Sequence, residues 1–162
     1  MEQATFIAKR VSKSATITLK GPIERVFPLF GPVEEKKWAD GWNPVVLYPT
    51  SGELEEGMVV TTQGHGHGEA VFAWIVSKYE TENHLIEYIV STANRYWVIT
   101  IRCFASSDTE TKATIQYTYT GLTPIGNEIN KHAIEKRYER DLKDWEEAIN
   151  HYLKTGEALK RH

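Results

Sequence analysis

Much of the chain before Gly121 alternates between hydrophobic and polar positions, which is typical of strands with one buried face. From Ser14 to Lys20, alanine, isoleucine and leucine alternate with threonine and lysine, so we expect a first strand there. Similar segments recur at hairpin spacing between Asn43 and Gly121, joined by short turns. Turns this short connect antiparallel neighbours. The further strands expected are Met58–Gln63, Ala70–Tyr79, Leu85–Ser91, Tyr96–Ala105 and Lys112–Gly121.

Two short helices are expected directly after the first strand. Pro22 follows a glycine and suits the first position of a helix over Ile23–Phe27. A Gly-Pro pair ends this segment and opens a second helix over Pro32–Trp38. Glu34 and Glu35 suit the N-terminus of that second helix.

After Gly121 the hydrophobic period changes to 3.6, which predicts a long amphipathic helix. Thr123-Pro124 supplies a cap and a first residue, and Thr155-Gly156 supplies the end. The opposite, charged face is typical of a solvated surface. The hydrophobic stripe consists of Ile125, Ile129, Ala133, Tyr138, Leu142, Trp145, Ile149, Tyr152 and Leu153.

This order of elements predicts an α+β fold, in which the long C-terminal helix lies across one face of a curved antiparallel sheet. The chain has 162 residues and shows no internal repeat or linker, so we expect a single domain over 1–162. Its core is expected at about 12–156, with short tails at both ends.

Composition and charge exclude several classes of protein. Hydrophobic residues make up 41% and charged residues 25%, as in a globular chain, and the net charge of −3 gives no basis for capturing nucleic acid. No apolar run approaches the roughly 18 residues of a membrane helix, and the N-terminus lacks the apolar stretch of a signal peptide. We therefore expect a cytoplasmic protein without membrane insertion.

The single cysteine excludes an intramolecular disulfide and any multi-cysteine metal site. Cys103 shares a two-residue period with Trp97, Ile99 and Ile101, which predicts a buried, unreactive thiol.

Three stretches resemble one known superfamily. They are Pro22-x-x-x-Val26-Phe27-Pro28-Leu29-Phe30 leading to Trp38-x-x-x-Trp42-x-Pro44, then Ser51-Gly52-x-x-x-x-Gly57-x-Val59, then Tyr117 to Leu122 leading to Trp145-Glu146-x-Ala148-Ile149-x-His151-Tyr152-Leu153. Together they are similar to the START-like (SRPBCC) helix-grip proteins, which include birch-pollen-allergen-like proteins, polyketide cyclases and lipid-transfer domains. The resemblance implies a cavity between sheet and helix for a lipid, sterol, polyketide or other aromatic ligand.

Aromatic residues make up 11% of the chain, so some of them are candidates to line such a cavity. Alternation turns Tyr88, Tyr117 and Tyr119 toward the interior. For each ring taken singly, simple packing in the core is an equally good interpretation. The candidate ligand-binding residues are Trp38, Trp42, Trp74, Tyr88, Tyr117 and Tyr119, with Ile129 and Ala133 from the helix.

A run of alternating glycine and histidine, Gly64 to Glu69, is the most unusual segment. If it is extended, His65, His67 and Glu69 project from one side and could form a metal or acid/base site. The glycines favour a solvated hairpin loop, and a polar lip of the cavity is a third interpretation. No second cluster of His or Cys offers further ligands, so we expect neither a metal nor another cofactor.

The sequence therefore predicts a module that binds one small hydrophobic or aromatic molecule. An alternative is a polyketide cyclase-like or dehydratase-like enzyme, in which cavity tyrosines or a lip histidine move protons. A further alternative is a partner-binding domain of the chaperone-cofactor kind that uses the outside of the sheet. A homodimer is compatible with the sequence, and nothing points to nucleic acid.

Overall fold

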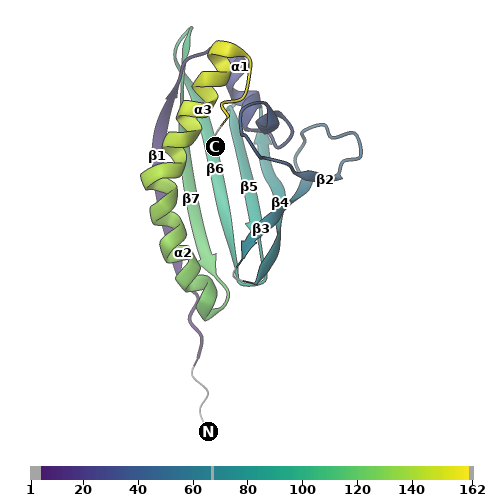
Figure 1. Ribbon diagram of the computed structural model, residues 1–162, viewed down its shortest axis with the longest axis vertical. Coiled ribbons are helices and arrows are strands. Elements are labelled where there is room, and N and C mark those ends of the chain that lie inside the picture. Colours follow the sequence, from purple (N-terminus) through teal and green to yellow (C-terminus); the bar gives the residue numbers. More distant parts are fainter. Residues whose placement is uncertain (1–4, 67, 161–162) are drawn as a thin grey trace.

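The computed structural model describes residues 5–66 and 68–160, and within them seven strands form one sheet (Figure 1). Every neighbouring pair is antiparallel, in the order β1-β7-β6-β5-β4-β3-β2. The strands from β2 to β7 form a meander, and β1 is added beside β7. The bounds are β1 Arg10–Leu19, β2 Val45–Tyr48, β3 Val59–Gly66, β4 Glu69–Glu80, β5 Leu85–Ser91, β6 Arg95–Ser107 and β7 Glu110–Gly121.

The expected strands are all present, but two features differ from the sequence prediction. β1 begins at Arg10 rather than Ser14, because it pairs with β7 along its whole length, from Arg10 opposite Thr120 to Leu19 opposite Thr111. β2 was not predicted. Its four residues lie at the edge of the sheet and are largely exposed, so no alternation marks them.

The segment after β1 forms short helical turns, as expected, although each is shorter than predicted. α1 (Ile23–Val26) passes directly into the 3₁₀ turn η1 (Phe27–Phe30), and a second 3₁₀ turn, η2, spans Glu34–Lys37. The prolines and Gly31 in this segment prevent longer helices. The second predicted helix is therefore a single turn.

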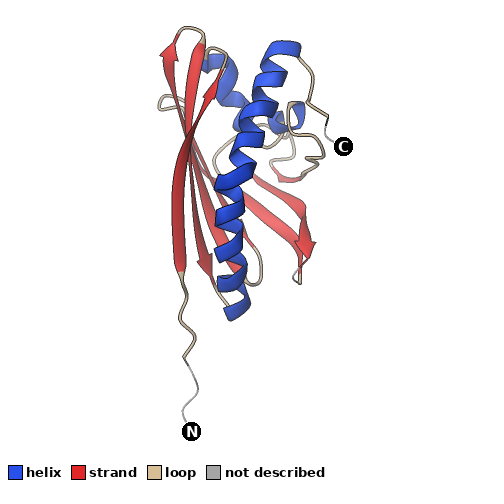
Figure 2. Ribbon diagram, turned by 60° about the vertical axis from the view of Figure 1, so that its left-hand side comes forward, coloured by secondary structure: helices blue, strands red, loops and turns tan. Residues whose placement is uncertain are grey.

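The predicted C-terminal helix is confirmed and runs as one rod along the sheet (Figures 1 and 2). It consists of α2 (Pro124–Lys136), a π-helical turn η3 (Arg137–Asp141) and α3 (Leu142–Thr155). The Thr123 hydroxyl accepts a hydrogen bond from the Gly126 N–H at 3.1 Å, which caps the start. Gly156 ends the helix with a φ of 78°. The π-helical turn was not predicted.

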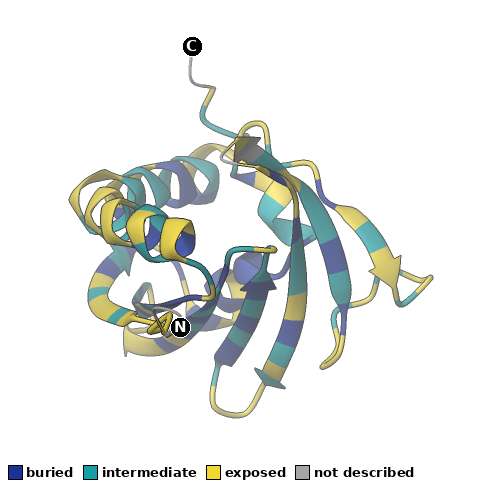
Figure 3. Cartoon of the chain, turned by 90° about the horizontal axis from the view of Figure 1, so that it is seen from below, coloured by how far each residue is buried: buried dark blue, intermediate teal, exposed yellow. Residues whose placement is uncertain are grey.

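The core lies between the helix and the inner face of the sheet (Figure 3). α3 contributes Leu142, Ile149 and Leu153, which pack into the same cluster as the inward residues of the strands. Cys103 is buried as expected, and burial raises the pKa of its thiol to about 12. Ile125, placed in the buried stripe by its spacing, is instead exposed.

The first turns of α2 bury Gly126 and Asn130, so the inward face there is polar and narrow. Within residues 5–66 and 68–160, no helix is long and apolar enough to span a bilayer.

Candidate functional site

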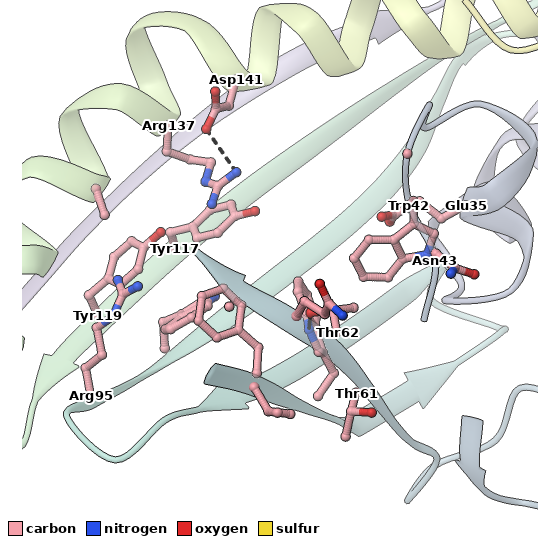
Figure 4. Close-up of a pocket in the computed structure, with 18 of the residues that line it drawn as sticks. Glu35, Trp42, Asn43, Thr61, Thr62, Arg95, Tyr117, Tyr119, Arg137 and Asp141 are labelled. Atoms are coloured by element: carbon pink, nitrogen blue, oxygen red, sulfur yellow. Dashed lines mark hydrogen bonds and ion pairs between the residues drawn. The ribbon is translucent and has the colours of Figure 1, made fainter. Parts of the chain in front are cut away.

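A cavity of about 810 Å³ lies between the sheet and the C-terminal helix (Figure 4). This volume is in the range of pockets that hold small organic molecules. β2, β3, β4, β6 and β7 contribute to its wall, as do the helix, η2 and the residues just before β2. The lining residues that are buried are Phe72, Arg95, Trp97, Tyr117 and Tyr119, and those that are exposed, and so form the mouth, are Gly41, Asn43, Val45, Gln63, Val71 and Lys136.

The inner wall is aromatic because alternation on neighbouring strands turns large rings to the same face. Tyr117 and Tyr119 both point inward from β7, with ring centroids 5.8 Å apart in a stacked arrangement. Trp97 of β6 lies opposite Tyr119 in the register, and their ring centroids are 5.4 Å apart. Phe72 of β4 meets the Trp97 ring edge-on. An apolar ligand could pack against these aromatic rings.

Five of the residues singled out from the sequence line this cavity: Trp42, Trp74, Tyr117, Tyr119 and Ala133. Trp42 and Trp74 face each other edge-on with centroids 5.2 Å apart. Their indole N–H groups are satisfied by the protein, since Trp42 donates to the Pro32 carbonyl and Trp74 to the Thr62 hydroxyl. Both rings are therefore held in place without a ligand. That any of the five binds a ligand stays a prediction.

Trp38, Tyr88 and Ile129 do not line this cavity. Trp38 is 2% exposed and donates its indole N–H to the Leu29 carbonyl at 2.8 Å. Tyr88 donates its hydroxyl to the Phe30 carbonyl at 2.5 Å. Tyr88 therefore anchors η1 to the sheet, and Trp38 ties the end of η2 to η1. Trp38 instead borders a second, smaller hollow of about 240 Å³, which shares Glu35 with the first cavity.

The Gly-His segment is only partly described. His67 lies outside the described residues, and nothing is established about the side chain of His65. Glu69, expected at the lip, is 4% exposed, because its carboxylate is paired with a buried arginine. In the part of the chain that the structure describes, no three His, Cys, Asp or Glu side chains are grouped to hold a metal ion.

The partner of Glu69 is Arg95, a buried lining residue that the sequence did not single out. Its Nε and Nη2 atoms donate to the two carboxylate oxygens, with shortest distances of 3.0 Å each. Nη1 donates to the Asn130 side chain at 3.3 Å, and the guanidinium lies 4.6 Å from the centroid of the Trp97 ring. This charge is therefore neutralised within the fold, as a buried charge must be.

Glu35 is the second lining residue that sequence reasoning missed. It projects from η2 and is half-buried, and its carboxyl group makes no hydrogen bond to a described residue. Burial raises its pKa to about 8, although Arg137 pulls the pKa in the opposite direction. At neutral pH this carboxyl is therefore mainly protonated, and it can both donate and accept a hydrogen bond.

Arg137 and Asp141, which begin and end the π-helical turn, complete this polar part of the cavity (Figure 4). Their side chains form an ion pair at 3.1 Å, and the guanidinium lies 4.7 Å from the centroid of the Tyr117 ring. Burial holds the pKa of Tyr117 well above its usual value, so its hydroxyl remains protonated. π-helical turns often occur at functional sites.

Weak signals for these residues are present in the sequence. Glu34 and Glu35 are adjacent, and only one of them can face inward; Glu34 pairs outward with Lys37. Arg137 and Asp141 have the four-residue spacing of an ion pair, which on a uniform helix is typical of a solvated face. Neither pattern alone indicates a cavity.

These features define the class of fold: a curved antiparallel sheet gripping one long helix around an internal cavity, which is the helix-grip fold. Neither a protein-family model nor a curated protein sequence matches the chain. Several solved structures, by contrast, are similar to this chain. Norcoclaurine synthase from Thalictrum flavum is 11% identical, with a TM-score of 0.67 over 94% of this chain and 94% of its own.

An aromatase/cyclase from a Streptomyces species is 12% identical, with a TM-score of 0.68 over 94% of this chain and 100% of its own. Ara h 8.0201 is 13% identical, with a TM-score of 0.65 over 91% of this chain and 99% of its own. The expected resemblance to START-like helix-grip proteins is thus confirmed for the fold. At these identities the likeness extends no further than the fold.

Proposed function

We propose that this protein binds one small aromatic or apolar molecule in the cavity between the sheet and the C-terminal helix. The observation that carries the proposal is the cavity itself, about 810 Å³ with an aromatic inner wall and a mouth at Lys136 and Gln63. Burying about 300 Å² of apolar ligand surface contributes about 7 kcal/mol before ordering costs, which is compatible with micromolar binding. One of the similar structures, norcoclaurine synthase, holds dopamine and hydroxybenzaldehyde, which are aromatic molecules.

To test this proposal, we would measure binding of a neutral fluorescent probe, N-phenyl-1-naphthylamine, to a variant whose cavity is filled by a larger side chain. Ala133 lines the cavity, so Ala133→Trp should lower the probe's affinity about tenfold or more. Lys131→Trp adds the same side chain to an exposed position of the same helix and should leave the affinity unchanged. Equal affinities for both variants, each shown to be folded by circular dichroism, would place the probe outside the cavity.

A second candidate, proton-transfer catalysis of the cyclase or dehydratase kind, is supported by Glu35. A carboxyl group with a pKa of about 8, open to a cavity and free of hydrogen bonds to described residues, suits a general acid or base near neutral pH. Tyr117 and Arg137 line the same cavity, where the phenol and the guanidinium could stabilise an enolate oxygen.

Exchange of α-protons tests for this chemistry without knowledge of the natural substrate. The protein is incubated with 2-tetralone in D₂O, and loss of the α-proton signals is followed by NMR. If the protein is such an enzyme, α-proton exchange should be faster than in buffer alone. The Glu34→Gln variant should keep this faster exchange, and the Glu35→Gln variant should lose it. The outcome against catalysis is exchange at the buffer rate when titration shows that tetralone binds and saturates the protein. That outcome would favour a binding role alone.

A further inference from the structure

The cavity is lined by two arginines, and their charges are compensated to different degrees. The charge of Arg95 is fully paired: Glu69 engages it through both carboxylate oxygens, and Asn130 accepts from its remaining terminal nitrogen. The two side chains of this ion pair are 8% and 1% exposed. Arg95 therefore has little capacity for a ligand, and its role is to hold the wall together.

Arg137 is only partly compensated. Asp141 contacts it through a single nitrogen, Nη1, and the side chains of this pair are 26% and 20% exposed. The Nε–H group is enclosed and has no hydrogen-bond partner. A guanidinium group carries five N–H donors, so most of its capacity is unused by this one ion pair.

Two phenols stand beside this guanidinium. Tyr117 and Tyr119 are each 1% exposed, and the Tyr117 hydroxyl makes no hydrogen bond to a described residue. Burial alone would lower the pKa of the Arg137 guanidinium. Nearby groups, including a hydrogen bond with Tyr119, outweigh this effect and raise the pKa. A buried phenol requires a partner, and here the cavity is the place from which one can come.

The balance of charge in the cavity also favours an anion. Arg95 is cancelled by Glu69, and Arg137 is paired with Asp141. Glu35 is mainly neutral at pH 7, as derived above. This leaves Lys136, at the mouth, as an uncompensated positive charge among the lining residues.

We propose that the ligand is an aromatic carboxylate, whose anionic group binds Arg137 beside the hydroxyls of Tyr117 and Tyr119 and whose ring system packs on the aromatic wall. A planar carboxylate matches the fork of a guanidinium and accepts from the adjacent phenols at the same time. Phe72, Trp74 and Trp97 provide the apolar surface for the rings. This inference rests on the proposed binding function and specifies its ligand class.

Three naphthalene probes of similar size test the charge preference by isothermal titration calorimetry at pH 7: 2-naphthoate, 2-naphthamide and 2-naphthylmethylammonium. We expect naphthoate to bind about tenfold or more tightly than the amide, and the cation to bind most weakly. If all three bind equally, the carboxylate preference is refuted while the binding function stands. If none binds, and the neutral fluorescent probe also fails, the binding function itself is refuted.

Substitutions on the same helix identify the residue responsible. Arg137→Gln should remove the advantage of naphthoate over naphthamide, whereas Arg140→Gln, an exposed arginine of the same π-helical turn, should keep it. The double variant Arg137→Gln with Asp141→Asn removes both charges, so it separates lost attraction from the newly unpaired carboxylate. If this double variant still prefers naphthoate, Arg137 is not the anion site.

Tyr117→Phe and Tyr119→Phe provide a second test that leaves the ion pair intact. Each should weaken naphthoate more than naphthamide, with an unchanged unfolding transition as the measure of an intact fold. Equal losses for the two probes would mean that the phenols contribute only packing, contrary to the proposed contact.

Discussion

Replacing Glu35 with glutamine should make the protein more stable in mildly alkaline solution. The ordinary pKa of this carboxyl group is 4.5, and burial raises it to about 8 in the folded protein because burial disfavours the charged form. Between these values the unfolded chain has lost the proton that the folded protein retains. The contribution of protonated Glu35 to the free energy of unfolding is therefore fully present below about pH 4.5, and it is lost as the pH rises toward 8.

The size of the effect follows from the same interval. At about 1.36 kcal/mol per pH unit, the interval between 4.5 and about 8 corresponds to at most about 5 kcal/mol. Glu35 is only half-buried and borders the open cavity, so solvent screening reduces the expected loss to about 2–3 kcal/mol. Glutamine has nearly the same shape and cannot ionise, so the Glu35→Gln variant avoids this loss.

Urea unfolding followed by circular dichroism, at pH 5 and at pH 9, measures the effect. The stability of Glu35→Gln relative to the original protein should increase by about 2–3 kcal/mol between the two conditions. Glu56→Gln, which changes an exposed carboxyl group in the turn before β3, should show no such increase. A relative stability of Glu35→Gln that is the same at both pH values would refute a raised pKa at this position.

Three further changes have expected outcomes. Naphthoate affinity should fall about tenfold from pH 7 to pH 9, because ionised Glu35 would add a negative charge that interacts with Arg137. Asp141, which lines the same cavity, and the neutral phenols of Tyr88 and Tyr117 supply no compensating positive charge. Titration calorimetry of Glu35→Gln should show no such fall. Glu69→Gln should cost about 3–5 kcal/mol in urea unfolding, since it leaves the buried Arg95 charge uncompensated; a cost below about 1 kcal/mol would contradict this. Thr123→Ala should cost about 1 kcal/mol by removing the helix cap, while Thr109→Ala, in the exposed β6–β7 turn, serves as its control.

Most of the fold could be predicted because one pattern dominated each element. The alternation of Leu85–Ser91 matches β5 at both ends, and Thr123 and Gly156 mark the bounds of the long helix. β2 could not be predicted, because its residues are exposed at the sheet edge and follow no alternation. The π-helical turn could not be predicted, because a single 3.6-residue period was assumed along the whole helix.

The strand part of the site was predictable from alternation. The inward direction of Tyr117 and Tyr119 follows from the pattern of β7. Glu69 was misplaced at the lip because its partner, Arg95, lies 26 residues away in the sequence and no local pattern links them. Glu35 of η2 and Arg137 of η3 both line the cavity, and they are brought together only by the tertiary fold.

The π-helical turn also gives the two halves of the helix different rotational settings. A turn closed by i→i+5 bonds holds one residue more than an α-helical turn, and one α-helical residue corresponds to about 100° of rotation. If these five residues were α-helical instead, with none removed, α2 would be rotated by about 100° against α3. Ile149 and Leu153 fix α3 in the core, so α2 would rotate and carry Ala133 out of the cavity wall. Deleting one residue of Arg137–Asp141, by contrast, would leave an ordinary α-helical turn and keep Ala133 on the cavity side, so the extra residue alters the helix only at the wall formed by this turn.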